Sequence, residues 1–178
     1  YSEVLGRSGW CSAETDVRQR EAVIATYRQI GSAPPDDGSN IASKARFGEG
    51  RALLCLEAAE LIPATEGRRL LEAVIADYAE SASDGDLREL SAESEGILGF
   101  VESQEATEDE EFAAALRRLD RAIDLTVFTD RVVSFRRAKV DALVAAGDPG
   151  AACDEVDKIE SLSRDSPVDE LRSEIDCP

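Results

Sequence analysis

The chain has 178 residues, of which 43% are apolar. This length and composition are sufficient for one domain with a hydrophobic core, and we expect that domain to cover residues 1–178. Its 38 acidic and 20 basic side chains give a net charge of −18, which disfavours nucleic acid as a partner because phosphates would be repelled. The absence of histidine removes imidazole relays and mixed zinc sites, so we expect no enzyme, no metal and no cofactor.

The apolar residues favour helices. Aromatic residues make up only 5% of the chain, and Ala and Leu dominate the apolar set, so an all-α fold is predicted. No stretch approaches eighteen consecutive apolar residues, so we expect no transmembrane segment. Because the chain opens at Tyr1, we expect an N-terminal segment to have been removed, and a signal or lipid-anchored leader is one candidate.

Apolar spacing predicts seven main helices and a short terminal one, after an irregular segment over 1–12. Pro and Gly residues between the predicted helices mark the loops. β-Branched residues near 126–129 predict a pause in the helix at this point. The C-terminal segment 166–178 is expected to cap the array. The predicted helices lie at about 13–30, 40–61, 63–78, 87–101, 107–125, 130–146, 149–162 and 168–175.

Local signals place two helix ends. Thr107 and Glu110 have the spacing of a capping box, which predicts a helix start at this point. Gly147 can accept the left-handed conformation that ends a helix, and Asp148 followed by Pro149 supplies a cap and a first-turn proline for the next one. A tight antiparallel helix pair is therefore predicted around residue 147.

One helical segment recurs along the chain. Residues 21–27 (EAVIATY) return at 72–78 (EAVIADY), and a looser copy (RAIDLTV) occupies 121–127. The spacings of 51 and 49 positions indicate a repeated helical unit. Stacked units of this kind present surface, so the repeat favours a binding scaffold.

Residues 131–167 resemble a tetratricopeptide repeat, with Gly147 at the turn, Ala152 as the small residue of the second helix and a terminator at 165–167. Residues 21–54 are similar. The resemblance implies a right-handed solenoid of about 3 to 3.5 antiparallel helix pairs that binds proteins or peptides, as in bacterial envelope lipoproteins that coordinate outer-membrane assembly. It thus favours a periplasmic, exported or envelope-anchored protein, with a cytoplasmic one as the alternative. The spacing near fifty exceeds the family's usual period of about 34.

The chain has four cysteines, Cys11, Cys55, Cys153 and Cys177, and no CxxC spacing. A bridge between Cys153 and Cys177 would pin the C-terminal segment and would require an oxidising compartment. The alternative is four separate thiols, with Cys55 as a small core residue.

Basic residues gather in two predicted first helices, and their guanidinium and ammonium groups could clamp a carboxylate or an acidic peptide on a concave face. The alternative is that they pair with acidic side chains of neighbouring helices. The candidate binding residues are Lys44, Arg46, Arg51, Arg131, Arg136, Arg137 and Lys139.

The sequence thus favours a non-catalytic scaffold that docks a protein or peptide. A second hypothesis is a carrier whose helices close around a small apolar ligand at Phe47, Leu54 and Tyr78. A third is an enzyme that uses carboxylates alone, although no pair of acids at a working distance can be named.

Only Lys44, Lys139 and Lys158 among the basic residues are lysines, and this scarcity together with the acid excess is typical of a salt-adapted protein. The alternative is a high-GC genome and an ordinary acidic surface. For a salt-adapted chain, the melting temperature should rise steeply between low and molar salt, because salt screens the repulsion among carboxylates. Thermal unfolding in a salt series measures this, and a flat curve would indicate the ordinary surface.

Overall fold

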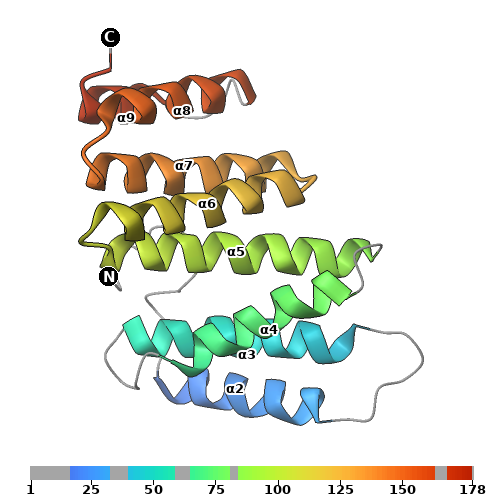
Figure 1. Ribbon diagram of the computed structural model, residues 1–178. Coiled ribbons are helices and arrows are strands. Elements are labelled where there is room, and N and C mark those ends of the chain that lie inside the picture. The colour runs from blue at the N-terminus through green and yellow to red at the C-terminus, as the bar shows by residue number, and fades with distance from the viewer. Residues whose placement is uncertain (1–16, 33–39, 59–64, 81–83, 163–167, 178) are drawn as a thin grey trace. The chain divides into compact units, whose positions relative to one another are not determined.

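The structure, a computed structural model, describes residues 17–32, 40–58, 65–80, 84–162 and 168–177 (Figure 1). Within these residues the chain forms eight α-helices and no strand, so the predicted all-α class is confirmed. The expected irregular segment 1–12, the residues 166–167 ahead of the last helix and Cys11 lie outside the described part. None of the described helices has the length and apolar character needed to cross a membrane.

The helix boundaries lie within a few residues of most predicted ones, and the predicted pause is present because one helix ends at Leu125 and the next begins at Thr129. The fourth predicted helix is longer than expected, since it extends through Glu105. The eight helices are α2 (Val17–Gly31), α3 (Ile41–Ala58), α4 (Glu66–Glu80), α5 (Gly85–Glu105), α6 (Asp109–Leu125), α7 (Thr129–Ala145), α8 (Pro149–Leu162) and α9 (Val168–Ile175).

The chain divides into two compact units, residues 1–94 and residues 95–178, where the sequence suggested one domain over 1–178. The boundary falls inside α5. Consecutive helices are packed against each other in both units, α2 on α3 and α3 on α4 in the first, and α6 through α9 in the second.

In the first unit, α2, α3 and α4 alternate in direction along the chain (Figure 1). Their shared core cluster consists of Ile24, Leu53, Leu56 and Leu70. The two helices α3 and α4 approach closely at a pair of glycines, because a Cβ atom on Gly67 would lie 3.0 Å from the carbonyl oxygen of Gly50. Small residues here allow the backbones to come together, which a larger side chain would prevent.

One core cluster of the second unit lies between α7, α8 and α9. Leu116 of α6 also packs against it. The helix positions that face inward are apolar at helical spacing, and their burial is the principal stabilising contribution. The buried residues of this cluster are Val140, Leu143, Ala152, Val156, Ile159 and Val168.

The turn between α7 and α8 has the predicted form. Gly147 adopts a φ of +78°, the left-handed conformation that favours glycine. The amide of Asp148 donates to the carbonyl of Leu143 at 2.9 Å, and its carboxylate accepts from the amide of Ala151 at 3.0 Å. One short segment therefore ends α7 and caps α8.

The predicted capping box at Thr107 and Glu110 is wrong by one residue. The N-cap of α6 is Glu108, and the side chain that reaches back is that of Glu111, which accepts from the amides of Thr107 at 2.8 Å and Glu108 at 3.2 Å. Glu111 can serve both amides because the helix begins at Asp109, one residue later than the sequence spacing suggested. These hydrogen bonds lower the pKa of the Glu111 carboxyl.

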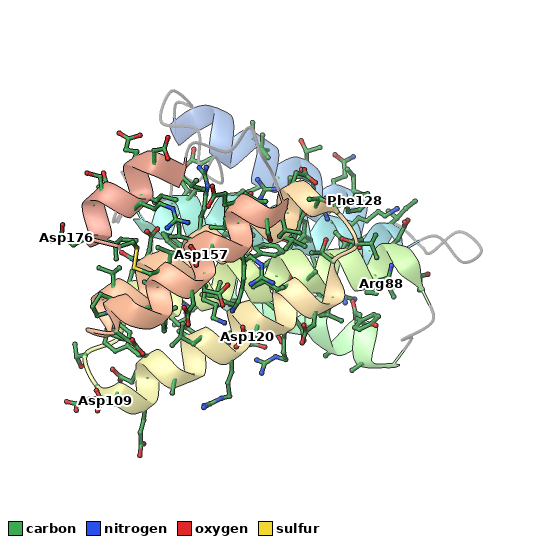
Figure 2. The ribbon with its side chains drawn as sticks, turned by 90° about the horizontal axis from the view of Figure 1, so that it is seen from above. Arg88, Asp109, Asp120, Phe128, Asp157 and Asp176 are labelled. Carbon is green, nitrogen blue, oxygen red and sulfur yellow. A yellow bond between two sulfur atoms is a disulfide. The ribbon has the colours of Figure 1, made fainter. Side chains whose placement is uncertain are left out.

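Cys153 of α8 and Cys177, which follows α9, form a disulfide with an S–S distance of 2.08 Å, visible as the yellow bond in Figure 2. This is the bridge that the sequence offered as one of two alternatives. Cys55 is also disulfide-bonded, so the alternative of four separate thiols is wrong. The bridge between Cys153 and Cys177 joins the C-terminal helix covalently to the core of its unit.

The three copies of the sequence repeat lie on α2, α4 and α6, every second helix. Their buried positions differ, however. Ile24 is the buried residue of the first copy, whereas Val74, one repeat position earlier, is buried in the second, and Ala122 and Thr126 are buried in the third. The repeat thus marks equivalent helices in the chain order but not equivalent contacts.

Gly96 of α5 is a position where an added methyl group should be costly. A Cβ atom there would lie 2.2 Å from the ring of Phe135, which is itself only 3% exposed. We expect Gly96→Ala to lower the free energy of unfolding by about 1–3 kcal/mol, because the buried ring must shift. Urea unfolding measures the change.

Gly85→Ala, in the same helix, is the matched control, since a Cβ atom there meets nothing within 4 Å. It should leave stability unchanged or raise it slightly. Adding Phe135→Leu to Gly96→Ala should recover part of the loss. An equal effect of the two glycine substitutions would contradict the assigned packing of α5 on α7.

Candidate functional site

The seven basic residues proposed from the sequence do not form one cluster. Lys44, Arg46 and Arg51 lie on α3 in the first unit, and the other four lie on α7 in the second. Each group is therefore considered within its own unit.

The three cations of α3 contact carboxylates of later helices in the same unit. Lys44 pairs with Asp86 at 2.6 Å, and Arg46 pairs with Asp77 of α4. Arg51 lies 3.9 Å from Glu93 and has its guanidinium 5.5 Å from the centre of the Phe47 ring. This is the internal pairing that the sequence analysis kept as an alternative to a ligand clamp.

On α7, two of the proposed cations surround a buried carboxylate. Glu155 of α8 is 3% exposed, and its oxygens lie 2.5 Å from Arg136, 3.1 Å from Lys139 and 2.7 Å from Lys158. Lys139 also contacts Asp120 of α6 at 2.6 Å. Glu155 therefore joins α7 and α8, and Lys139 extends the cluster to α6 through Asp120.

Glu155 is held ionised by these contacts. Burial opposes its charge, but hydrogen bonds from Lys158, Arg136 and Lys139 outweigh burial, so the net effect lowers the pKa of Glu155. Burial similarly opposes the charge of Lys139, but Asp120 and Glu155 raise its pKa. Both partners stay charged at neutral pH, as an ion-pair cluster requires.

The two remaining α7 residues have different surroundings. The guanidinium of Arg131 lies 5.1 Å from the centre of the ring of Phe128, which is 48% exposed. Arg137 is half-buried. Partial desolvation and the nearby Glu174 raise the pKa of Asp141, and the charge of Arg137 opposes this shift.

A second buried carboxylate occupies α5. Glu95 is 4% exposed and accepts from two arginines of α6, at 2.8 Å from Arg118 and at 2.8 and 3.3 Å from Arg121. Arg118 also donates to Glu102 at 2.9 Å. These contacts join α5 and α6 along a line of alternating charge.

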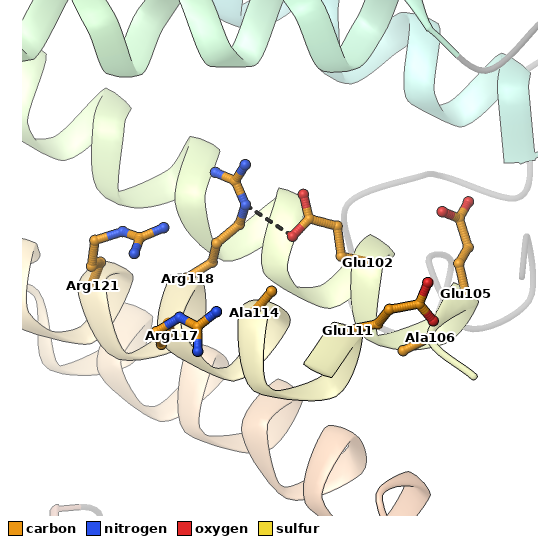
Figure 3. A pocket seen from close by; sticks show the side chains of 8 residues that line it. All are labelled: Glu102, Glu105, Ala106, Glu111, Ala114, Arg117, Arg118 and Arg121. Atoms are coloured by element: carbon orange, nitrogen blue, oxygen red, sulfur yellow. Dashed lines mark hydrogen bonds and ion pairs between the residues drawn. The ribbon is translucent and has the colours of Figure 1, made fainter. Parts of the chain in front are cut away.

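Beside this line lies a pocket of about 460 Å³ in the groove between α5 and α6. Figure 3 shows its charged side chains in two groups, with the arginines at one end and the glutamates at the other. Two alanines, Ala106 and Ala114, complete the lining. The charged lining residues are Glu102, Glu105, Glu111, Arg117, Arg118 and Arg121.

This pocket was not predicted from the sequence, although the sequence contains a signal for it. Glu102 and Glu105 are three residues apart at the end of α5, and Arg117 and Arg121 are four apart on α6, so each pair shares a helix face. A short connection between antiparallel helices brings those faces together. The basic residues of α3 and α7 were predicted as the binding site instead, because they are clustered in sequence.

Two of the three residues proposed for an apolar ligand belong to the core of the first unit. Phe47 is 7% exposed and Leu54 is 2% exposed, while Tyr78 is half-buried. Leu54 also lies at the close approach of α3 and α4, where its amide would be 3.0 Å from a Cβ on Gly67. In the part of the chain that the structure describes, acidic residues and cysteines do not gather in a group that could hold a metal ion.

Comparison with known proteins gave no match. No protein-family model matches the chain, and neither the curated proteins nor the solved structures include a match to it. Its function is therefore inferred from its own residues and their geometry.

Glu155→Gln should remove the anion at the centre of the α7 and α8 cluster while keeping its size. We expect the free energy of unfolding at pH 7 to fall on the order of 3 kcal/mol, because buried cations lose their partner. The pKa of Glu155 is lower in the folded state than in the unfolded chain, where it is about 4.3. The ionised carboxylate therefore contributes its full stabilisation above the unfolded-state pKa. That contribution is lost as the pH falls through the folded-state pKa. The difference between wild type and variant should thus shrink on acidification.

Urea unfolding at pH 7, 5, 4 and 3 measures this difference. Glu170→Gln, at an exposed position of α9, is the control and should change little at any pH. If Glu155→Gln behaved like the control, the buried cluster would not contribute to stability as assigned.

Proposed function

We propose that the chain is a non-catalytic module that docks a protein or peptide segment. Its architecture would be a right-handed, tetratricopeptide-like solenoid of about 3 to 3.5 antiparallel helix pairs. The pair α7 and α8 supports this, since Gly147 ends the first helix and the fully buried Ala152 is the small residue of the second. Packing between consecutive helices in each unit is compatible with such a repeat.

The observation that carries the docking proposal is the pocket between α5 and α6. It is recessed, its volume is about 460 Å³, and it is lined by charges of both signs. Arg117 makes no ion pair with any described residue, whereas Arg118 and Arg121 are bound to Glu95. A cation that has no ion-pair partner among the described residues, in a chain of net charge −18, is suited to an anionic group of a ligand.

The pocket is preferred over the α7 cations as the docking site. Arg136 and Lys139 hold the buried Glu155, and their substitution would alter stability as well as binding. Arg117 is exposed and can be changed without breaking an internal ion pair among the described residues.

The buried carboxylates support a non-catalytic role. A carboxylic acid that donates a proton near neutral pH needs a raised pKa, which burial without a cationic partner provides. Glu155 has a lowered pKa, and Glu95 is bound by two arginines. Glu155 thus stays ionised, and both carboxylates hold helices together through their ion pairs.

The disulfide supports an oxidising compartment. A periplasmic, exported or envelope-anchored location fits it, and the resemblance to envelope lipoproteins of the tetratricopeptide type points the same way. A cytoplasmic protein remains the alternative, in which this bond would be reduced.

Arg117→Glu should abolish docking if the pocket is the site. Reversal of this charge adds a fourth carboxylate to the lining and removes a charge-assisted contact, so we expect the partner's affinity to fall roughly 10-fold or more. The measurement is affinity capture from an extract of the source organism at its native salt, with quantified recovery.

Arg69→Glu on α4 is the matched control, because its side chain is 70% exposed and its one ion-pair partner among the described residues, Glu66, is 3.9 Å away. Circular dichroism should show both variants folded. A protein retained by wild type and by Arg69→Glu but lost with Arg117→Glu supports the proposal. Equal recovery with both variants, or no capture at all, contradicts it.

A further inference from the structure

The last helix is held to its unit by one covalent bond and few other contacts. α9 has eight residues and lies beside α8 (Figure 1). Of these eight residues, Val168 alone is buried, and it is the first of them. A helix of this length is not stable by itself in water, because few hydrogen bonds form to offset the ordering of its first turn. The helical form of α9 therefore depends on its contacts with the rest of the unit.

The apolar contacts of α9 are concentrated at its start. Val168 is 6% exposed and belongs to the core cluster that α7 and α8 share. Leu171 and Ile175 pack against the same cluster but are half-buried. The other buried members of the cluster belong to α7 and α8 themselves. That helix pair therefore keeps apolar contacts of its own when α9 is absent.

Charge attracts α9 in one place and repels it in another. Arg172 donates to Asp157 at 2.6 Å and to Glu160 at 2.7 Å, both on α8. These two carboxylates are more than half exposed, so their ion pairs contribute little. Partial desolvation raises the pKa of Asp141 on α7, and the charge of Glu174 on α9 adds to this shift. Like charges thus oppose each other where α9 approaches α7.

Both helices of this contact are also acidic overall. α8 has four acidic residues and one basic residue, and α9 has three acidic residues and one basic residue. Two helices of the same sign repel each other unless other contacts offset the repulsion. The noncovalent attraction that holds α9 is therefore small.

The end of α9 is fixed by the disulfide. Asp176, directly after the helix, has a φ of +60°, a left-handed conformation that costs free energy in residues other than glycine. The amide of Cys177 donates to the carbonyl of Arg172 at 3.0 Å and closes the helix end. Cys177 is then bonded to Cys153 of α8 (Figure 2). Both cysteines are half-buried, so their bond is not enclosed in the core.

From these contacts we propose that the bond between Cys153 and Cys177 is a redox latch for α9. In the oxidised chain α9 covers part of the apolar cluster of α7 and α8. When a dithiol reductant opens the bond, α9 detaches, loses its helical form and uncovers that surface. α7 and α8 stay together through their own core and through Glu155. The latch does not depend on the pocket between α5 and α6 or on what docks there.

The reductant supplies everything that the reaction needs. One thiolate of the dithiol attacks a sulfur of the bond, forms a mixed disulfide and releases the other cysteine as a thiolate. The second thiolate of the reductant displaces the remaining cysteine and closes the reductant's own disulfide. Two electrons pass to the chain, and the two protons of the dithiol end on the cysteines. Reoxidation reverses these steps and restores the latch.

Hydrogen exchange of the full chain, with and without dithiothreitol, tests the latch directly. Reduction should accelerate exchange of the amides at 168–175 by about 10-fold or more, because α9 no longer remains helical. The amides at 140–143 and 152–159 should stay protected. Binding of a fluorescent apolar dye should rise at the same time, and reoxidation should reverse both changes.

A variant separates this bond from the disulfide of Cys55, which dithiothreitol also reduces. The double substitution Cys153→Ser and Cys177→Ser, without reductant, keeps the bond of Cys55 and should show the same rapid exchange in α9. Slow exchange in α9 of this variant or of the reduced wild-type chain overturns the proposal. Loss of protection throughout α7 and α8 also overturns it, because the unit would then unfold as a whole.

Redox titration against glutathione gives a second measure, because contacts that hold α9 in place also favour its disulfide. Arg172→Gln removes an attraction and should lower the equilibrium constant for forming the bond roughly 2- to 5-fold. Glu174→Gln removes a repulsion and should raise that constant. Ser173→Ala, at an exposed position of α9, is the control and should leave it unchanged. Mass spectrometry of alkylated peptides follows this bond separately, and equal constants in all four chains would contradict the latch.

Discussion

The packing of this acidic chain depends on carboxylates that are buried between helices and neutralised there by basic side chains. Glu155 holds α7 and α8 through Arg136 and Lys139, and Glu95 holds α5 and α6 through Arg118 and Arg121. A carboxylate buried without cations would be strongly destabilising. The arginines and lysines around each buried glutamate are therefore required as its ion-pair partners. The surplus of acid therefore determines how the scarce basic residues are used.

Because these basic residues are already paired, they are less available to bind an anionic ligand. Cations that look available in the sequence, such as Arg136 and Lys139, are engaged by Glu155 and contribute to stability. Arg117 differs because it lies on the exposed side of α6 and forms no ion pair with any described residue. The same ion-pair line that joins α5 and α6 leaves a polar recess at its edge, with a spare cation at one end.

Local features of the fold were predictable, and the site was not. Gly147 and Asp148 form the predicted turn, because a left-handed glycine and an Asx cap act within a few residues. The capping box was displaced by one residue, since Thr107 and Glu108 are both able to begin the turn and only the reach of Glu111 distinguishes them. The pocket depends on two helix faces meeting, which no local pattern reports.

The sequence by itself determined that the chain is helical, where most helices end, and that a bridge between Cys153 and Cys177 was one of two choices. These properties follow from composition, apolar spacing and short-range hydrogen bonds. The tertiary structure alone decided which charges meet, because Arg118 reaches Glu95 across 23 positions and Arg136 reaches Glu155 across 19. Pairing at such separations depends on the rotation of each helix about its axis, which is set by how the apolar faces pack.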